Sequence, residues 1–242
     1  MLVHLGSAAF ILRFVFPRAD ATRRRELANR WAQDLLAILA IRLECVGEAP
    51  AHGEGGGLIA ANHVSWVDVF AIGAVRHTRF VAKSEIRDWP VAGPIAASAG
   101  TLFVHRARRH DTGRIANQVK EALAAGDFVG LFPEGTTTEG DELLKFHSSL
   151  FEPAVAHGAP VHPVAIRYLH PDGTPCRAAA FVGELTFAQS LGLVIRTREM
   201  VARVAFGDPV PAAGLSRREV AALTHARVAT LLDLPTPRSG PG

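Results

Sequence analysis

The sequence is poor in cysteine, in lysine and in long apolar runs, and the shortages of cysteine and of apolar runs each exclude a class of structure. Only two cysteines occur, Cys45 and Cys176. Their spacing fits neither a metal site nor a redox pair, so we expect reduced thiols in a reducing compartment and no bound metal. A membrane-spanning helix needs about 18 uninterrupted apolar residues, but prolines and glycines interrupt the nearest candidate, Trp89 to Val104. No spanning helix is therefore predicted.

The N-terminal segment is apolar but lacks the pattern of a signal peptide. It contains His4 and Arg13, and it has no basic start followed by a cleavage site of small residues. We therefore expect it to remain in the mature protein. Lysine occurs at only three positions, so arginine supplies most of the positive charge. We attribute this bias to genome composition.

The overall composition is that of a globular protein. The chain has 242 residues, of which 48% are hydrophobic and 20% charged, and its net charge is +3. This length predicts one α/β domain with appendages. The net charge is small and the basic residues are not interleaved with aromatic ones, which argues against binding to nucleic acid.

Two helical patterns open the chain, over Leu2–Phe16 and Thr22–Cys45, with Pro17 and an arginine run at 23–25 between them. An apolar hairpin flanked by arginines is suited to the headgroup region of an anionic bilayer. A helix pair packed on the core of its own domain is the alternative. We therefore expect residues 1–50 to form a helical hairpin, with membrane docking as its predicted role.

After a glycine-rich linker at 51–57, short β-like runs alternate with helices, which predicts an α/β sheet domain over residues 51–234. The predicted strands are Leu58–Ala61, Arg79–Lys83, Thr101–His105, Phe128–Phe132, Val161–Arg167, Ala178–Val182 and Val201–Phe206. Helices are predicted over Gly113–Ala125 and from a capping box at Ser216 and Glu219 to about Leu232. Residues 235–242 are predicted to be a flexible tail.

The first motif with chemical potential is Asn62-His63-Val64-Ser65-Trp66-Val67-Asp68. If a helix begins near Ser65, Asp68 lies in its first turn and can reach back to the His63 imidazole. A carboxylate on one ring nitrogen leaves the other free to take a proton from a hydroxyl. The alternative is structural, because Ser65-x-x-Asp68 is also a capping box and His63 could be an ordinary loop residue.

Two further motifs follow predicted strands. One is Phe128 to Thr138, a strand that enters the turn Pro133-Glu134-Gly135-Thr136. Backbone amides and hydroxyls in such a turn suit an anion, although a plain turn with a threonine helix cap is also possible. The other is the strand that ends near Arg106, a residue type that pairs two phosphate oxygens at once. Arg108 and Arg109 beyond it fit a solvated charge run.

Taken in this order, the His-x4-Asp motif, the strand before Arg106, Phe-Pro-Glu-Gly-Thr and the strand Val161–Ile166 resemble the lysophospholipid acyltransferase family. The resemblance spans roughly Leu58 to Pro209. It implies a mixed sheet flanked by helices, like that of glycerol-phosphate acyltransferases, preceded by a helical hairpin that docks on a membrane.

The resemblance also implies roles for single residues. His63 corresponds to the general base and Asp68 to its partner. Arg106 corresponds to a phosphate contact, and Glu134, Gly135 and Thr136 to the acceptor site. No cofactor is implied beyond the co-substrate, acyl-CoA or acyl-carrier protein. The predicted partner is membrane lipid, at the cytoplasmic face of the inner membrane, with peripheral or monotopic attachment.

The predicted reaction moves a fatty acyl group to the hydroxyl of a lysophospholipid, with 1-acyl-glycerol-3-phosphate, which gives phosphatidic acid, as the first candidate. Where many members have a basic, glycine-containing stretch, this chain has Lys145-Phe146-His147-Ser148-Ser149-Leu150-Phe151. Similar stretches occur in proteins that resemble lyso-ornithine-lipid acyltransferases, which are the alternative. A thioester hydrolase and a non-catalytic lipid-binding protein are further alternatives. The chain has no Gly-x-Ser-x-Gly elbow, so direct transfer without an acyl-enzyme is expected.

Overall fold

The computed structural model describes residues 18–51, 55–88, 93, 96–97, 100–104 and 109–233. Three predictions fall outside these residues: the first helix over Leu2–Phe16, the phosphate contact Arg106 and the tail at 235–242.

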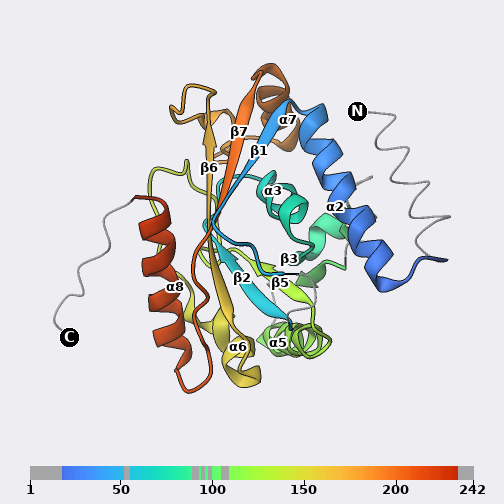
Figure 1. Cartoon of the computed structure of the whole chain (residues 1–242), viewed down its shortest axis with the longest axis vertical. Coiled ribbons are helices and arrows are strands. Elements are labelled where there is room, and N and C mark those ends of the chain that lie inside the picture. Colours follow the sequence, from blue (N-terminus) through green and yellow to red (C-terminus); the bar gives the residue numbers. More distant parts are fainter. Residues whose placement is uncertain are drawn as a thin grey trace.

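A single mixed sheet organises the described residues (Figure 1). Its strands are β1 (Ile41–Val46), β2 (Gly57–Ala61), β3 (Arg79–Lys83), β4 (Leu102–Val104), β5 (Phe128–Leu131), β6 (Val161–Leu169) and β7 (Met200–Phe206). They lie in the order β1-β7-β6-β2-β5-β3-β4. From β6 to β4 all neighbours are parallel, whereas β7 runs antiparallel to β6 and parallel to β1. The predicted mixed sheet is confirmed.

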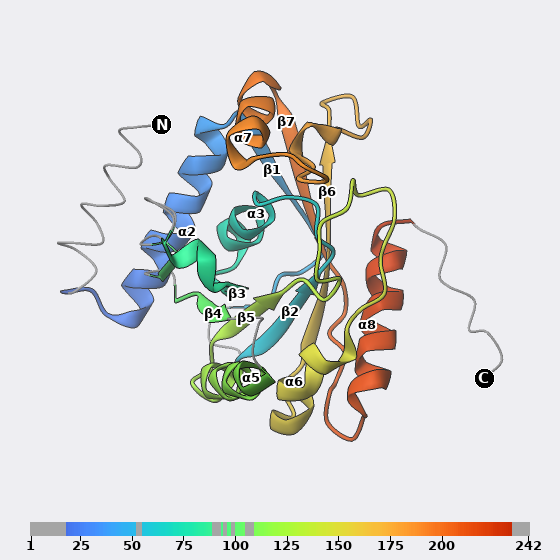
Figure 2. The same cartoon turned by 180° about the vertical axis from the view of Figure 1, so that it is seen from behind.

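Helices cover both faces of the sheet (Figures 1 and 2). One face carries α2 (Ala21–Ile38), α3 (Asp68–Val75) and α7 (Phe187–Arg196), and the other carries α5 (Arg109–Ala124), α6 (Glu152–His157) and α8 (Arg217–Leu231). Strand β2 shows why the sheet is buried on both sides. Ile59 and Ala61 enter the core under α2 and α3, while Leu58 and Ala60 enter the opposite core. Successive side chains of a strand point to opposite faces, so the uninterrupted apolar run 58–61 fits a central strand.

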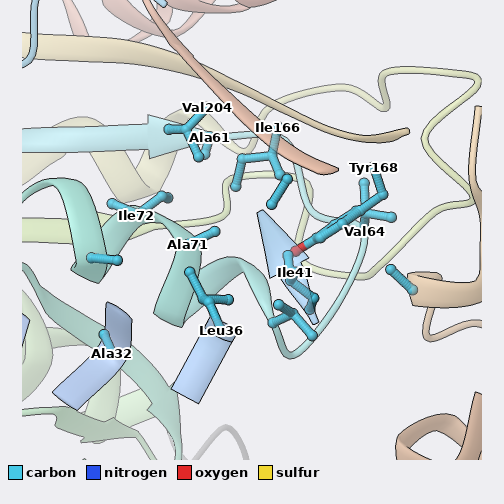
Figure 3. Packing of buried hydrophobic residues seen from close by; sticks show 14 of the residues in the cluster. Ala32, Leu36, Ile41, Ala61, Val64, Ala71, Ile72, Ile166, Tyr168 and Val204 are labelled. Carbon is cyan, nitrogen blue, oxygen red and sulfur yellow. The ribbon is translucent and has the colours of Figure 1, made fainter. Parts of the chain in front are cut away.

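The core beneath α2 and α3 is shown in Figure 3. It combines Ala32 and Leu36 of α2, Ala71 and Ile72 of α3, and strand residues such as Ile166 and Val204. Helix α2 is also tied to the domain by polar contacts, because Arg25 Nη2 lies 3.0 Å from Asp127 Oδ1 and Gln33 Nε2 donates to the Ala74 carbonyl at 2.9 Å. The second predicted helix therefore packs on the core of its own domain.

The prediction of a helix from Thr22 to Cys45 is wrong beyond Ile38. Ala40 takes a positive φ of 55°, which ends the helical path, and β1 then pairs with β7 from Ile41 onward. Glu44 and Arg203 join the two strands, with Arg203 Nε 3.1 Å from Glu44 Oε1. Apolar and polar residues alternate from Ile41 to Glu44, as a strand with one buried face requires. Residues 41–46 therefore belong to the sheet and not to a helix.

The strand predicted over Ala178–Val182 is also wrong. The chain forms a short 3-10 helix, η5 (Arg177–Ala179), and then an irregular segment. Phe181 N donates to the Val64 carbonyl at 2.9 Å, and Thr137 Oγ1 donates to the Phe181 carbonyl. The backbone groups of Phe181 are therefore used to hold two loops and not to extend the sheet.

The other elements predicted within the described residues are confirmed. Arg79–Lys83 agrees in both bounds, and the other five strands overlap closely with the predicted ranges. The capping box at Ser216 is present, with Glu219 N donating to Ser216 Oγ and Ser216 N donating to Glu219 Oε2. Within the described part of the chain, none of the helices combines the length and apolar character that crossing a bilayer requires.

Candidate active site

The candidate active site lies where the parallel strands β2, β5 and β6 reach their carboxyl ends. β2 ends at Ala61 and leads into His63, β5 ends at Leu131 and leads into the Glu134 turn, and Tyr168 lies near the end of β6. Parallel neighbours present their carboxyl ends at one edge, where open α/β sheets bind ligands. The sheet order thus gathers loops that are far apart in the sequence.

His63 and Asp68 are in direct contact, as the motif predicts. His63 Nδ1 lies 2.8 Å from Asp68 Oδ2, and Asp68 is fully buried, whereas the His63 side chain is 22% exposed. The same carboxylate oxygen accepts hydrogen bonds from the backbone N–H groups of Val64 and Ser65, at 2.8 and 2.9 Å. Asp68 therefore accepts hydrogen bonds from the loop backbone and also orients the imidazole. The structural and the catalytic interpretation of the motif both apply to this one carboxylate. Helix α3 begins at Asp68 and not near Ser65.

This contact assigns the protons of the imidazole. A carboxylate oxygen can only accept, so Nδ1 carries the hydrogen and Nε2 keeps its lone pair when the ring is neutral. The ring is also fixed from one side, because it stacks on Phe132 with centroids 3.9 Å apart and an interplanar angle of 9°. A neutral imidazole held in one tautomer beside a buried carboxylate can act as a general base.

Glu134 holds the backbone of His63. Its Oε1 accepts from His63 N at 2.7 Å and its Oε2 accepts from Leu144 N at 2.8 Å. Burial raises the pKa of this carboxyl, and the two backbone hydrogen bonds oppose that shift. With 4% of its surface exposed, Glu134 joins the loop after β2 to the turn after β5. Its contacts are with the protein backbone, so its acceptor role stays a prediction.

Further backbone contacts enclose the histidine loop. Thr138 N donates to the His63 carbonyl at 2.9 Å, and Phe181 N donates to the Val64 carbonyl at the same distance. Asn62 binds the backbone of β6, since its Oδ1 accepts from Ile166 N at 2.7 Å and its Nδ2 donates to the Ile166 carbonyl at 3.0 Å. These contacts hold the imidazole on a rigid support.

A pocket of about 440 Å³ opens beside this loop. It is lined by Glu134, Gly135, Thr136, His147, Ser149 and Leu150. The structure therefore brings the three residues predicted for the acceptor site together with three from the divergent stretch after Lys145. Gly135 has a φ of +76°, and a Cβ at this position would lie 3.3 Å from the His147 ring. Glycine thus lets the turn approach His147 closely.

Three functional candidates were not predicted as site residues. Asn62 and His147 both lie inside motifs that the sequence singles out, but their contacts are not apparent from spacing. Tyr168 donates a hydrogen bond from its hydroxyl to Asp68 Oδ1 at 2.7 Å. The available signal was that Tyr168 is the only tyrosine of the chain and lies near the end of an apolar strand. Among the described residues, no group of His, Cys, Asp and Glu is arranged to hold a metal ion.

An imidazole held by a buried carboxylate at the carboxyl edge of a mixed α/β sheet is the arrangement of an enzyme that removes a proton from a hydroxyl or from water. Comparison with known proteins narrows this class. Residues 42–167 match the family described as Acyltransferase. The chain belongs to this family, and its resemblance to the lysophospholipid acyltransferases is confirmed.

Individual relatives support the same assignment. The chain is 39% identical over 219 residues to a lyso-ornithine lipid O-acyltransferase of Pseudomonas aeruginosa, covering 90% of this chain and 83% of that protein. It is 40% identical over 172 residues to a 1-acyl-sn-glycerol-3-phosphate acyltransferase of Neisseria meningitidis serogroup B, covering 71% and 67%. A lyso-ornithine lipid O-acyltransferase of Brucella abortus is 32% identical over 246 residues, covering 96% and 91%.

A solved structure has the same fold. The crystal structure of the 1-acyl-sn-glycerophosphate acyltransferase from Thermotoga maritima matches with a TM-score of 0.64 and 21% identity, covering 95% of each chain. The mixed sheet with its flanking helices is therefore the fold of this family. The family match and the relatives above show that the protein is an acyltransferase.

Proposed function

We propose that the protein transfers a fatty acyl group from a thioester donor, acyl-CoA or acyl-carrier protein, to the free hydroxyl of a lysolipid. The observation that carries this proposal is the 2.8 Å contact between His63 Nδ1 and Asp68 Oδ2, which leaves Nε2 as the base. Membership of the family supports acyl transfer as the reaction, and the His63–Asp68 pair can activate the acceptor hydroxyl.

In the proposed reaction, His63 Nε2 takes the proton of the acceptor hydroxyl. The oxygen then attacks the thioester carbonyl carbon, and a tetrahedral intermediate forms. When it collapses, the carbon–sulfur bond breaks and the proton passes from the imidazolium to the leaving thiolate. The products are an ester and a free thiol, and the imidazole is neutral again. Asp68 stabilises the imidazolium throughout, because its buried negative charge lies against the ring.

The acceptor head group is proposed to lie in the pocket beside His63. Two acceptor classes have support. A lyso-ornithine lipid is favoured by relatives of that name that match 90% and 96% of this chain. Their match extends well beyond the 71% covered by the Neisseria meningitidis relative. 1-Acyl-glycerol-3-phosphate is the second candidate, because that relative is equally close in identity within its matched region. His147 and Ser149 offer hydrogen bonds to either head group.

We further propose that the enzyme binds a membrane surface peripherally, at the cytoplasmic face of the inner membrane, where both thioester donors occur. Helix α7 supports this proposal. It exposes Phe187, Leu193 and Ile195, at 37%, 40% and 50%, and Phe187 packs against Trp66 of the histidine loop, with ring centroids 5.1 Å apart. Exposed apolar side chains on a helix that contacts the histidine loop suit contact with the bilayer that carries the substrate. Arg196 and Arg198, both exposed, adjoin these side chains and suit anionic head groups.

The test is transfer by purified protein. Acyl-CoA or acyl-carrier protein is supplied with lyso-ornithine lipid, 1-acyl-glycerol-3-phosphate or lysophosphatidylethanolamine, and products are identified by mass. We expect one diacyl product to dominate, and His63→Ala to reduce its rate by about two to four orders of magnitude while the protein remains folded. Release of free fatty acid at a rate independent of acceptor would identify a hydrolase instead. A folded His63→Ala protein with the wild-type rate would exclude His63 as the base.

A further inference from the structure

Tyr168 is buried in the hydrophobic core and contacts Asp68 of the candidate catalytic pair. It lies near the carboxyl end of β6, with 5% of its surface exposed, inside the core under α2 and α3. Figure 3 shows its ring among the apolar side chains of that core, with Val64 and Ile166 in the same group. Its hydroxyl donates to Asp68 Oδ1 at 2.7 Å.

The two oxygens of Asp68 have separate partners. Oδ2 accepts from His63 Nδ1, Val64 N and Ser65 N. Oδ1 accepts from the Tyr168 hydroxyl. An ionised carboxylate that is fully buried needs donors on both oxygens to offset its desolvation. Without the tyrosine hydroxyl, Oδ1 would lose the one hydrogen bond found for it among the described residues.

The hydroxyl of Tyr168 stays protonated and therefore remains a donor. Burial, together with the charge of Asp68, raises the pKa of Tyr168 well above its ordinary value. A phenol that cannot ionise at working pH acts only as a neutral hydrogen-bond donor here. His63, Asp68 and Glu134 are the other titratable groups that contact this cluster through hydrogen bonds.

We propose that Tyr168 is a positioning residue for the His63–Asp68 pair: its hydroxyl fixes the rotation of the Asp68 carboxylate and shares its negative charge. This inference rests on the proposed function, in which His63 is the base. With the carboxylate locked, Oδ2 faces the imidazole and the base keeps its direction. With part of the charge drawn to the phenol, the carboxylate stabilises the imidazolium less than it would without the tyrosine.

Removing the hydroxyl therefore has two predictable effects. In Tyr168→Phe the carboxylate loses the donor on Oδ1 and is held only through Oδ2, so its orientation is less restricted and kcat falls, by about 10-fold for the loss of one hydrogen bond to a charged group. The full charge of Asp68 then acts on the imidazolium, so the acid limb of the kcat/KM profile moves to higher pH, by about half to one unit. KM for the acceptor lipid stays the same, because Tyr168 does not line the pocket.

The experiment compares wild type, Tyr168→Phe and a packing control across pH, with the acceptor found for the wild type. Val204→Ala is the control, since Val204 is fully buried in the same core. It lowers thermal stability without moving the acid limb. A Tyr168→Phe profile that coincides with the wild type, or a Val204→Ala profile that moves equally, overturns the inference. His63→Ala with the wild-type rate overturns the proposed function, and the inference with it.

A second measurement does not depend on whether Tyr168→Phe folds. Because Tyr168 is the only tyrosine, growth with 3-fluorotyrosine labels this position alone. In the wild-type sequence the fluorine resonance is expected to shift between about pH 5 and pH 8, the range in which a histidine side chain can change charge, and this step is expected to be lost in His63→Ala. A resonance that does not respond to pH over that range overturns the proposed coupling. This result is obtained even when transfer itself is absent, so the two failures are distinguishable.

Discussion

The backbone N–H of His63 donates to Oε1 of Glu134 at 2.7 Å, across 71 positions of sequence. The second oxygen, Oε2, accepts from Leu144 N at 2.8 Å. One buried carboxylate thus connects the loop that carries the base to Leu144, which lies in the segment between Thr136 and His147 of the pocket.

Glu134→Gln is expected to loosen the His63 loop. Glutamine keeps the shape of the side chain, but its NH₂ group meets one of the two N–H donors, which then loses its acceptor. A buried donor left without an acceptor costs about 1 to 3 kcal/mol. We expect the free energy of unfolding to fall by that amount and kcat to fall at least about 10-fold, since base geometry depends on this support. Denaturant unfolding and steady-state kinetics measure both. Glu142→Gln, an exposed site in the same segment, is the control, and equal behaviour of the two variants would contradict the prediction.

His147→Ala is expected to weaken binding of the acceptor lipid. His147 lines the pocket next to Gly135, so its loss removes a hydrogen-bonding group from the proposed head-group site. One such interaction contributes about 0.5 to 1.5 kcal/mol, which corresponds to a rise of about 2- to 10-fold in the acceptor KM. We expect kcat and the KM of the thioester donor to change little. Titration of each substrate at saturation of the other separates these constants, and a rise confined to the donor KM would assign the pocket to the donor.

Ile195→Glu is expected to reduce membrane binding without disturbing the fold. Ile195 is 50% exposed on α7, and insertion of its free surface contributes about 1 kcal/mol. A carboxylate at this position cannot enter the bilayer, so partitioning onto anionic vesicles should fall about 10-fold. Leu223→Glu is the matched control, because Leu223 is 44% exposed on α8, which covers the opposite face of the sheet. Vesicle sedimentation measures the difference, and equal losses in both variants would show that α7 has no special part.

His77 is expected to make the fold sensitive to acid. Burial, followed by the charge of Arg25, lowers the pKa of His77 from 6.5 to about 4. Because the folded protein favours the neutral ring, the resulting stability is fully present above pH 6.5 and is lost as the pH falls through about 4. The linkage amounts to at most about 3 kcal/mol.

The test for His77 is urea unfolding of the wild type and His77→Gln between about pH 4 and pH 7. Glutamine does not titrate, so the variant should lose less stability on acidification than the wild type does. Parallel curves for the two proteins would indicate that His77 binds its proton equally in the folded and unfolded states.

Local sequence patterns predicted most of the fold. The run Arg79–Lys83 forms β3 as predicted, and the Ser216–Glu219 pair caps α8. Both depend on neighbours within a few residues, through alternation of side chains or through a cap. The errors arise where a distant partner decides. The helix predicted to continue to Cys45 ends at Ile38, because pairing with β7 makes Ile41–Val46 a strand. Ala178–Val182 has strand-like composition, but its backbone groups bond to loops.

The candidate site likewise combines a contact that local sequence predicts with contacts that depend on distant residues. The sequence by itself determined the contact between His63 and Asp68, because five positions across a loop and a helix start bring the two side chains together. Only the tertiary structure decided that Glu134 holds the His63 backbone and that Tyr168, 100 positions away, donates a hydrogen bond to Asp68. The reason is the sheet order β6-β2-β5, which places the carboxyl ends of three separate strands side by side, and no local spacing encodes that order.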